Sequence, residues 1–212
     1  MPEKGLRVLT AALDRLKSPW RALLVGAGPL EGELRAWAAR RPDAVRLATD
    51  VNHAGVPAHL AAMDVMACPS QTTRTWKEQF GRMVIEAFAA GVPVVGSDSG
   101  EIPHVLGTAG VVVPEADTAA WVEQLDALLA DPDRRRALAA VGRARALGEF
   151  AWPVVARQYC DFFDRVRETG VGGRGVARPP TSLTQTPSPF APVSPAATGP
   201  RPTPASTGLP AG

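Results

Sequence analysis

Two glutamates with seven residues between them mark the stretch whose residue types and spacing could do chemistry. Glu78 and Glu86 flank Phe80-Gly81 and apolar residues at helical spacing, so Glu78 is expected at a helix entrance and Glu86 about two turns inside. A glycine before the first turn lets a ligand approach the backbone, where free N–H groups favour an anion. Carboxylates accept hydrogen bonds from hydroxyls. The stretch therefore predicts a site with carboxylates for sugar hydroxyls and a helix N-terminus for phosphate.

The elements around this helix predict how it is positioned. Gly91 is placed to end the helix, and Pro93 cannot continue it. A strand ending at Cys68 and a polar loop over 71–77 precede Glu78. Because open α/β sheets bind ligands at the carboxyl ends of parallel strands, we expect Glu78 and the residues after it at that edge.

Apolar runs and amphipathic helices alternate along the chain, which predicts one α/β domain with a mainly parallel sheet over residues 5–168. The strands are expected at Arg21–Val25, Val45–Leu47, Asp64–Cys68, Val92–Gly96 and Gly110–Val113. Helices are expected at Leu6–Leu16, Glu31–Arg40, Pro57–Ala62, from a cap at Asp117 or Thr118 to about Ala130, from Asp131 to about Leu147, and at Trp152–Val166.

The last part of the chain has a different composition. From Gly170 onward there is no acidic residue, and ten of the 21 prolines lie between Pro179 and Pro210. Such a segment cannot bury enough apolar surface to offset the entropy of ordering. We therefore expect a folded domain over 1–169 and a disordered tail over 170–212.

Charge, cysteines and histidines exclude several classes of function. The net charge is +2, to which the tail contributes +3, so the body is near neutral and nucleic acid is not an expected partner. Cys68 and Cys160 read as unpaired thiols of a reducing compartment, and no apolar run reaches about 18 residues, so a cytoplasmic location is expected. His53, His59 and His104 have no ligand spacing, so no metal site is predicted.

The motifs around the two glutamates closely resemble glycosyltransferase family 4. The resemblance rests on Trp76-Lys-Glu-Gln-Phe-Gly81, the Glu-x7-Glu spacing, Glu86-Ala-Phe-Ala-Ala-Gly-Val-Pro-Val-Val95 and Ser99-Gly-Glu-Ile-Pro103. Members are retaining enzymes of the GT-B fold that use nucleotide-sugar donors. The resemblance covers residues 2 to about 168 and only the donor-binding half of such an enzyme. It implies a Rossmann-like sheet with helices on both faces.

The resemblance also implies roles for individual residues. Glu86 would accept hydrogen bonds from the ribose hydroxyls, and Glu78 would hold a hydroxyl of the transferred sugar. Lys4 would offset the charge that grows on the leaving diphosphate, so Glu78 and Lys4 are the catalytic candidates. Further donor-binding candidates lie around the helix start: Gln79, Phe80, Gly81, Met83 and Val84.

Two more donor-binding candidates, Val51 and His53, lie in the loop after the second expected strand. The resemblance puts the nucleobase near Val51, Asn52 and His53. A plain surface loop is the alternative for each of these side chains. No cofactor or metal is required in this scheme; the donor is a nucleoside diphosphate sugar, and the acceptor is an unknown sugar, lipid or small molecule.

Three functions are compatible with these features. The first is a retaining hexosyltransferase whose acceptor half was lost to a late start codon or lies on another chain. The second is a donor-binding remnant or subunit with no catalysis of its own. A sugar-nucleotide epimerase of similar fold is the third, and its motifs differ around the second glutamate. Peripheral membrane contact is expected only through an acceptor-binding N-terminal domain.

The resemblance implies one more strand, between those at Arg21–Val25 and Asp64–Cys68, and an arginine beside it, both before Met1. Without that strand, its two neighbours must pair with each other, pair with another chain, or stay poorly ordered. The 212-residue polypeptide alone is therefore expected to be marginally stable, to aggregate, and to transfer no sugar measurably.

For the last helix, the resemblance implies packing on the N-terminal domain. From its pattern alone, packing on its own domain is equally compatible.

Overall fold

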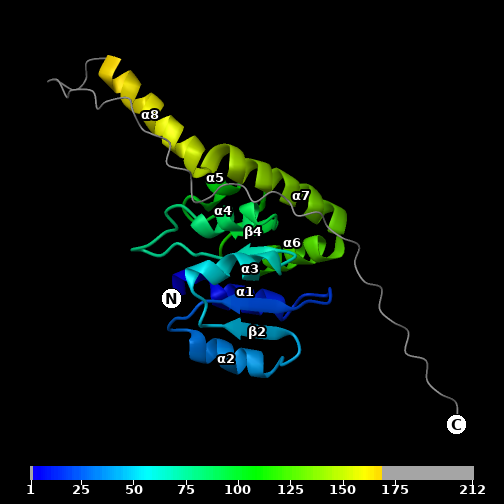
Figure 1. Cartoon of the computed structure of the whole chain (residues 1–212). Coiled ribbons are helices and arrows are strands. Elements are labelled where there is room, and N and C mark those ends of the chain that lie inside the picture. The colour runs from blue at the N-terminus through cyan, green and yellow to red at the C-terminus, as the bar shows by residue number, and fades with distance from the viewer. Residues whose placement is uncertain (1, 169–212) are drawn as a thin grey trace, which may run out of the picture. The chain divides into compact units, whose positions relative to one another are not determined.

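The computed structural model of the chain describes residues 2–168 (Figure 1). These residues belong to one compact unit. The tail that we expected to be disordered, 170–212, lies outside the described residues, so that expectation stays a prediction. Among the described residues, no helix is both long and apolar enough to cross a membrane.

Five short strands alternate with helices in the order that the sequence predicted. The strands are β1 (Ala22–Val25), β2 (Val45–Ala48), β3 (Met66–Cys68), β4 (Val94–Ser97) and β5 (Val111–Val113). The α-helices are α1 (Leu6–Leu13), α2 (Glu31–Ala39), α3 (Val56–Ala61), α4 (Arg82–Ala89), α5 (Ile102–Leu106), α6 (Thr118–Ala130), α7 (Pro132–Arg145) and α8 (Trp152–Glu168). Shorter helical turns are η1 (Pro2–Lys4), η2 (His53–Gly55) and the π-helical η3 (Ala146–Phe150).

All strand pairs are parallel, but they form two separate sheets. β1 pairs with β2, Ala22 opposite Val45, and β3-β4-β5 form the other sheet in that order. In Figure 1, the sheet that contains β2 lies below the sheet that contains β4, within the same domain. The α/β class with a parallel sheet is thus confirmed, and the two strands expected to flank a missing one do not pair with each other.

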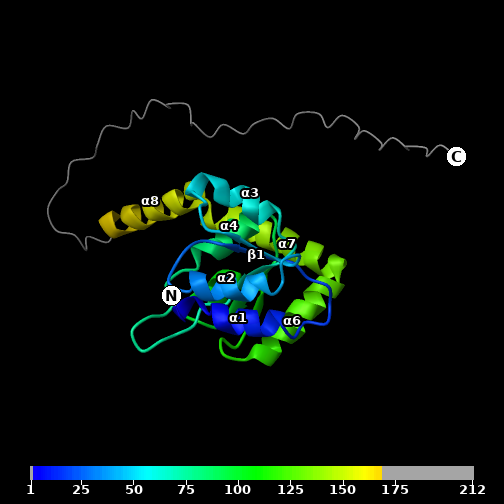
Figure 2. The ribbon, with the colours of Figure 1, turned by 90° about the horizontal axis from the view of Figure 1, so that it is seen from below.

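Helices cover both faces of the sheets, as the resemblance implied. Adjacent β4 residues point to opposite sides because side chains alternate along a strand. Val94 packs among residues of α3, α4 and α5, whereas Val95 packs among residues of α1, α2 and α6. Figure 2, viewed from below, shows α1, α2 and α6 in the lower part of the view and α3 and α4 in the upper part. Each face therefore has its own hydrophobic core.

Caps set the bounds of the long C-terminal helices. The Asp117 side chain accepts from the N–H groups of Ala119 and Ala120, and Asp131 accepts from Arg134. These bonds satisfy amides that have no partner inside the helix. Asp117 is therefore the cap of α6, which settles the choice between Asp117 and Thr118.

Helix α8 does not bury its aromatic face. None of its described residues is buried, and Trp152 is 85% exposed. Phe163 stacks on Tyr159 and meets Phe162 edge to face within the helix itself. The aromatic residues of α8 therefore do not pack on their own domain, contrary to one of the two alternatives: each of the four is more than half exposed.

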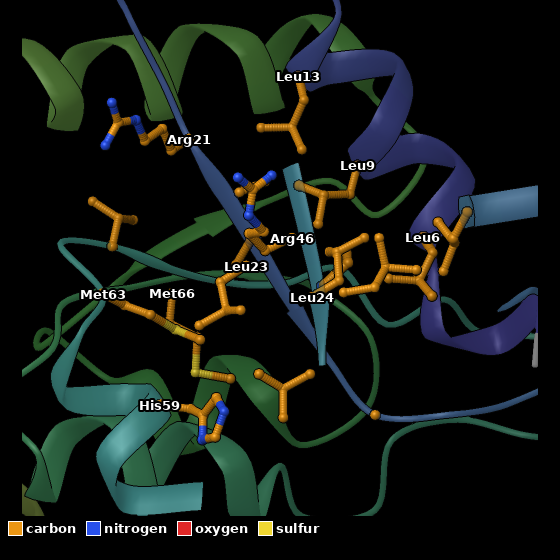
Figure 3. Close-up of a pocket in the computed structure, with 18 of the residues that line it drawn as sticks. Leu6, Leu9, Leu13, Arg21, Leu23, Leu24, Arg46, His59, Met63 and Met66 are labelled. Atoms are coloured by element: carbon orange, nitrogen blue, oxygen red, sulfur yellow. The ribbon is translucent and has the colours of Figure 1, made fainter. Parts of the chain in front are cut away.

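A cavity of about 1570 Å³ separates β1 from β3 (Figure 3). Both strands line it, together with side chains of α1 and α3. At one end it reaches the carboxyl edge of the sheets, where Lys4, Met83 and Glu86 also line it.

Candidate functional site

The loop that carries Glu78 is held against the turn that precedes α5. The Glu78 carbonyl accepts from the Glu101 N–H at 3.0 Å. Gly100 has a left-handed φ of +56°, and a Cβ added there would lie 1.9 Å from the Glu78 carbonyl oxygen. Only glycine permits this conformation and this approach together. The motif glycine therefore fixes where the Glu78 backbone lies.

Glu78 is the centre of a hydrogen-bonded cluster. Lys4 Nζ donates to Oε2 at 3.1 Å, and the buried Ser70 hydroxyl donates to the same oxygen at 3.3 Å. The Gly81 N–H donates to Oε1 at 3.4 Å, just before α4 begins. Only 13% of the Glu78 side chain is exposed. The carboxylate is thus oriented by groups from η1, from the residues after β3 and from the turn before α4.

These contacts keep Glu78 ionised. Burial alone would raise the pKa of its carboxyl, because it disfavours the charged form. The hydrogen bond and charge of Lys4 and the bonds from Gly81 and Ser70 outweigh burial, so the pKa lies below its usual value. At neutral pH, Glu78 is therefore a hydrogen-bond acceptor and not an acid.

Burial has the opposite effect on the neighbouring cysteine. It raises the pKa of the Cys68 thiol to about 11, and the charge of Glu78 acts in the same direction. The thiol is therefore protonated at neutral pH, and a buried thiol of this kind is not a nucleophile.

Lys4 reaches Glu78 because η1 lies beside the end of β3. The Gln71 N–H donates to the Glu3 carbonyl at 2.8 Å. The Lys4 ammonium lies 4.8 Å from the centre of the Trp76 ring, a cation–π contact. The side chain stays 38% exposed, so its charge faces the cavity edge. A cation at this place suits an anionic ligand.

Helix α4 supplies the second glutamate. Gly81, with φ 73°, caps α4, whose first N–H groups have no intrahelical partner. Glu86, about one turn inside, is 31% exposed and forms a 3.3 Å ion pair with Arg82. Met83 and Glu86 both line the cavity, whereas the interposed Val84 does not. One side of α4 therefore faces the cavity.

The structure brings several predicted site residues together and separates others. Lys4 contacts Glu78, and Lys4, Met83 and Glu86 share the carboxyl end of the cavity. Val84 is fully buried among core side chains, and its N–H donates to the Gly81 carbonyl, so its side chain cannot touch a ligand.

The remaining candidates lie apart from the cavity. Gln79 is exposed, and Phe80 is 48% exposed and meets Phe150 edge to face. Val51 and His53, expected near a nucleobase, are not among the residues that line the cavity. Their roles in binding stay predictions.

Sequence reasoning missed other residues of this edge. Gly26, Ala27 and Gly28 follow β1 and line the same end of the cavity, as do Val56 and His59 of α3. The sequence led to no predicted role for these glycines. Their place at the carboxyl end of a buried parallel strand was the signal that could have identified them.

Within residues 2–168, no group of three or more His, Cys, Asp and Glu side chains could hold a metal ion. The described site offers an anion the charge of the Lys4 ammonium and the amides that begin α4.

Comparison with known proteins places these features in a family. The model described as Glycosyl transferases group 1 matches residues 1–131. The phosphatidyl-myo-inositol mannosyltransferase of Mycobacterium leprae (strain TN) is 35% identical over 174 residues, which cover 80% of this chain and 45% of that protein. A GDP-mannose-dependent monoacylated alpha-(1-6)-phosphatidylinositol monomannoside mannosyltransferase of Corynebacterium glutamicum is 32% identical over 74% of this chain and 43% of its own length.

A solved structure agrees with the sequence relatives. Sucrose-phosphate synthase of Thermosynechococcus elongatus superposes with a TM-score of 0.67 at 27% identity, over 80% of this chain and 44% of that one. This chain spans about half the length of the relatives that it matches. Because the family model covers more than half of its 212 residues, the chain belongs to the group 1 glycosyl transferases.

Proposed function

We propose that this chain binds the nucleoside diphosphate sugar donor of a retaining hexosyl transfer. The observation that carries the proposal is the end of the cavity where Lys4, paired with Glu78, and Glu86 of α4 lie at one sheet edge. Open α/β sheets bind nucleotides at this edge. The family relation supports the same reading, since the Corynebacterium glutamicum relative is GDP-mannose-dependent by name.

The proposed roles follow from the charges at this edge. The diphosphate lies between the Lys4 ammonium and the first N–H groups of α4, which favour an anion. As the bond to the sugar breaks, negative charge grows on the diphosphate, and Lys4 stabilises it. Glu86, which also forms an ion pair with Arg82, accepts hydrogen bonds from the two ribose hydroxyls.

Glu78 binds the transferred sugar in this scheme. Its lowered pKa makes it an acceptor for a sugar hydroxyl at neutral pH. Its contact with Lys4 also links the sugar to the diphosphate, because one side chain orients the other. We further propose a metal-independent reaction and, from the names of the relatives, a phosphatidylinositol-type lipid as the acceptor.

Calorimetric titration with GDP-mannose, and in parallel with UDP-glucose, tests donor binding. Glu86→Gln preserves the shape of the side chain but weakens its hydrogen bonds, so a loss of about 1–3 kcal/mol in affinity is expected. Glu123→Gln on the exposed face of α6 is the matched control and should bind as the unmodified chain does. Unchanged affinity in a well-folded Glu86→Gln protein would remove the ribose role.

A donor-binding subunit without transfer activity is the second candidate, because the chain spans about half of its relatives. The two candidates differ in one measurement. Release of GDP from GDP-mannose in the presence of phosphatidylinositol vesicles indicates turnover by this chain. Donor binding without any release indicates the subunit.

A further inference from the structure

The backbone of Lys4 is held against the end of β3 by the residues on either side of it. The Gln71 N–H donates to the Glu3 carbonyl at 2.8 Å. Gly5 has a left-handed φ of +62°, and a Cβ added there would overlap the Pro69 carbonyl. Only glycine permits this close approach. The turn that carries Lys4 is therefore fixed to the segment that follows β3.

The loop 71–77, which continues from that segment, is anchored at its base to residues that follow β4 and β5. The Thr72 N–H donates to Glu115 Oε2 at 2.7 Å, and the Thr72 hydroxyl oxygen lies 3.1 Å from that of Ser99. The Gln71 side-chain amide donates to the Glu115 carbonyl at 3.1 Å. The start of the loop therefore has a fixed place at the carboxyl edge of the sheets.

A turn within this loop orients Trp76. The Thr73 N–H donates to the Trp76 carbonyl at 2.7 Å, and the Trp76 N–H donates to the Thr73 hydroxyl at 3.1 Å. Trp76 is half-buried, and the centre of its ring lies 4.8 Å from Lys4 Nζ. The loop therefore brings an aromatic ring to the Lys4 ammonium.

The Lys4 ammonium thus has two partners that restrict it. Nζ donates to Glu78 Oε2 at 3.1 Å, and the Trp76 ring attracts the same charge. Glu78 Oε1 accepts from the Gly81 N–H at 3.4 Å, so the ammonium is held close to the start of α4. A lysine side chain has several rotatable bonds, and holding its charged end in place beforehand lowers the entropy cost of binding an anion.

These contacts suit a role in binding better than a role in stability. The Lys4 side chain is 38% exposed, and contacts of exposed charges contribute little to the free energy of unfolding. Without such partners, a lysine at this position would extend its ammonium into water. Lys4 lines the same end of the cavity as Glu86, where the donor is proposed to bind. The restraint on Lys4 therefore favours an anion at that end.

We propose that Trp76 is a positioning residue of the donor site: its ring holds the Lys4 ammonium at the start of α4 for the diphosphate. This inference rests on the proposed donor binding and adds an aromatic residue to that site. Trp76 acts through Lys4 and makes no contact of its own with the nucleotide. The diphosphate gains from the restraint, because it is the part of the donor that meets the ammonium.

Nuclear magnetic resonance of the full chain with isotopically labelled lysine tests the contact without any ligand. The lysines of the chain are Lys4, Lys17 and Lys77, so each side-chain signal can be assigned by substitution. Protons over the face of an aromatic ring are shielded, so the ε-methylene signal of Lys4 should lie upfield of that of Lys17. In Trp76→Leu, the Lys4 signal should move to the position of the Lys17 signal.

Calorimetric titration with GDP tests the consequence for binding. Trp76→Leu should weaken GDP binding by about two- to fivefold, the effect of one cation–π contact at an exposed site. Trp76→Phe retains a ring face and should recover most of this loss. In a Lys4→Ala background, Trp76→Leu should have no further effect, because the ring acts through Lys4. Trp152→Leu is the matched control, since Trp152 is 85% exposed on α8, and it should bind GDP as the unmodified chain does.

Three results would overturn this role of Trp76 and leave the donor site in place. One is a Lys4 signal at the position of the Lys17 signal in the unmodified chain, where misfolding of a variant is not the cause. Another is unchanged GDP binding in a folded Trp76→Leu protein. The third is an equal loss in the Lys4→Ala background, which would mean that the ring contacts the nucleotide directly. If the unmodified chain binds no GDP, the proposed function itself fails, and the role of Trp76 with it.

Discussion

Strands β4 and β1 have similar apolar sequences and very different surroundings. All four residues of β4 are buried, and the strand is paired on both edges. None of the four residues of β1 is buried, and Val25 at its end is 38% exposed. The contrast teaches that an apolar run specifies a buried strand only when both neighbours are present. The candidate donor site lies at the carboxyl edge of the sheets, between the packed β3-β4-β5 sheet and the cavity beside β1.

The largest expected difference between the two regions is the cost of removing a large side chain. Phe88 is fully buried beside Gly142, so Phe88→Ala should cost about 3–5 kcal/mol of unfolding free energy. Leu23 already borders a cavity, so Leu23→Ala should cost only about 1 kcal/mol. Urea unfolding of both variants measures this. Equal losses would mean that the cavity between β1 and β3 closes in solution.

A second prediction concerns the turn that holds Glu78. Gly100→Ala forces a side chain into a left-handed backbone and against the Glu78 carbonyl, so a loss of about 2 kcal/mol or more is expected. Gly148→Ala in η3 meets nothing within 4 Å and should stay within about 0.5 kcal/mol of the unmodified chain. Thermal unfolding of the pair is the measurement, and indistinguishable midpoints would show that the loop is not fixed by this contact.

The Lys4–Glu78 pair predicts a pH dependence of stability. The folded pKa of Glu78 is lowered, so its stabilisation is fully present above the unfolded pKa and is lost as the pH falls through the folded pKa. Unfolding free energies of the unmodified chain and Glu78→Gln should therefore differ by about 1 kcal/mol or less at pH 7 and converge in acid. A difference that grows toward low pH would contradict the assignment.

The smallest expected effect belongs to the exposed pair on α4. Arg82 is 78% exposed, and its ion pair with Glu86 is of the i,i+4 kind. Arg82→Ala should change stability by no more than about 0.5 kcal/mol. A loss of more than about 1 kcal/mol of unfolding free energy in urea would mean that Arg82 packs against the side chains that line the cavity.

Much of the fold could be predicted from local pattern. The order of strands and helices followed from apolar runs between amphipathic stretches, and the aspartate caps of α6 and α7 followed from residue type. Boundaries were less accurate: β3 begins at Met66, not Asp64, because pairing with β4 starts only there. The sequence pattern does not indicate at which residue a strand begins to pair with its neighbour.

The candidate site was predictable in its motif and not in its geometry. The Glu-x7-Glu motif led to α4 and the resemblance to Lys4, but the contact of Lys4 with Glu78 joins residues 74 positions apart. Val84 was one of the donor-binding candidates, and the structure buries its side chain in the core. The exposed aromatic residues of α8 likewise show that the sequence of an apolar helix face does not identify the surface on which the helix packs.

We propose that a nucleotide binds at the carboxyl edge of the sheets, beside the cavity between β1 and β3. Hydrogen exchange in the presence of saturating GDP tests this binding most directly. Exchange should slow at the start of α4, from Gly81 to Met83, and in the turn 26–28 after β1. Exchange in α7, which lies away from that edge, should not change. Slowing confined to α7 or α8, or no slowing anywhere at saturating nucleotide, would contradict the account.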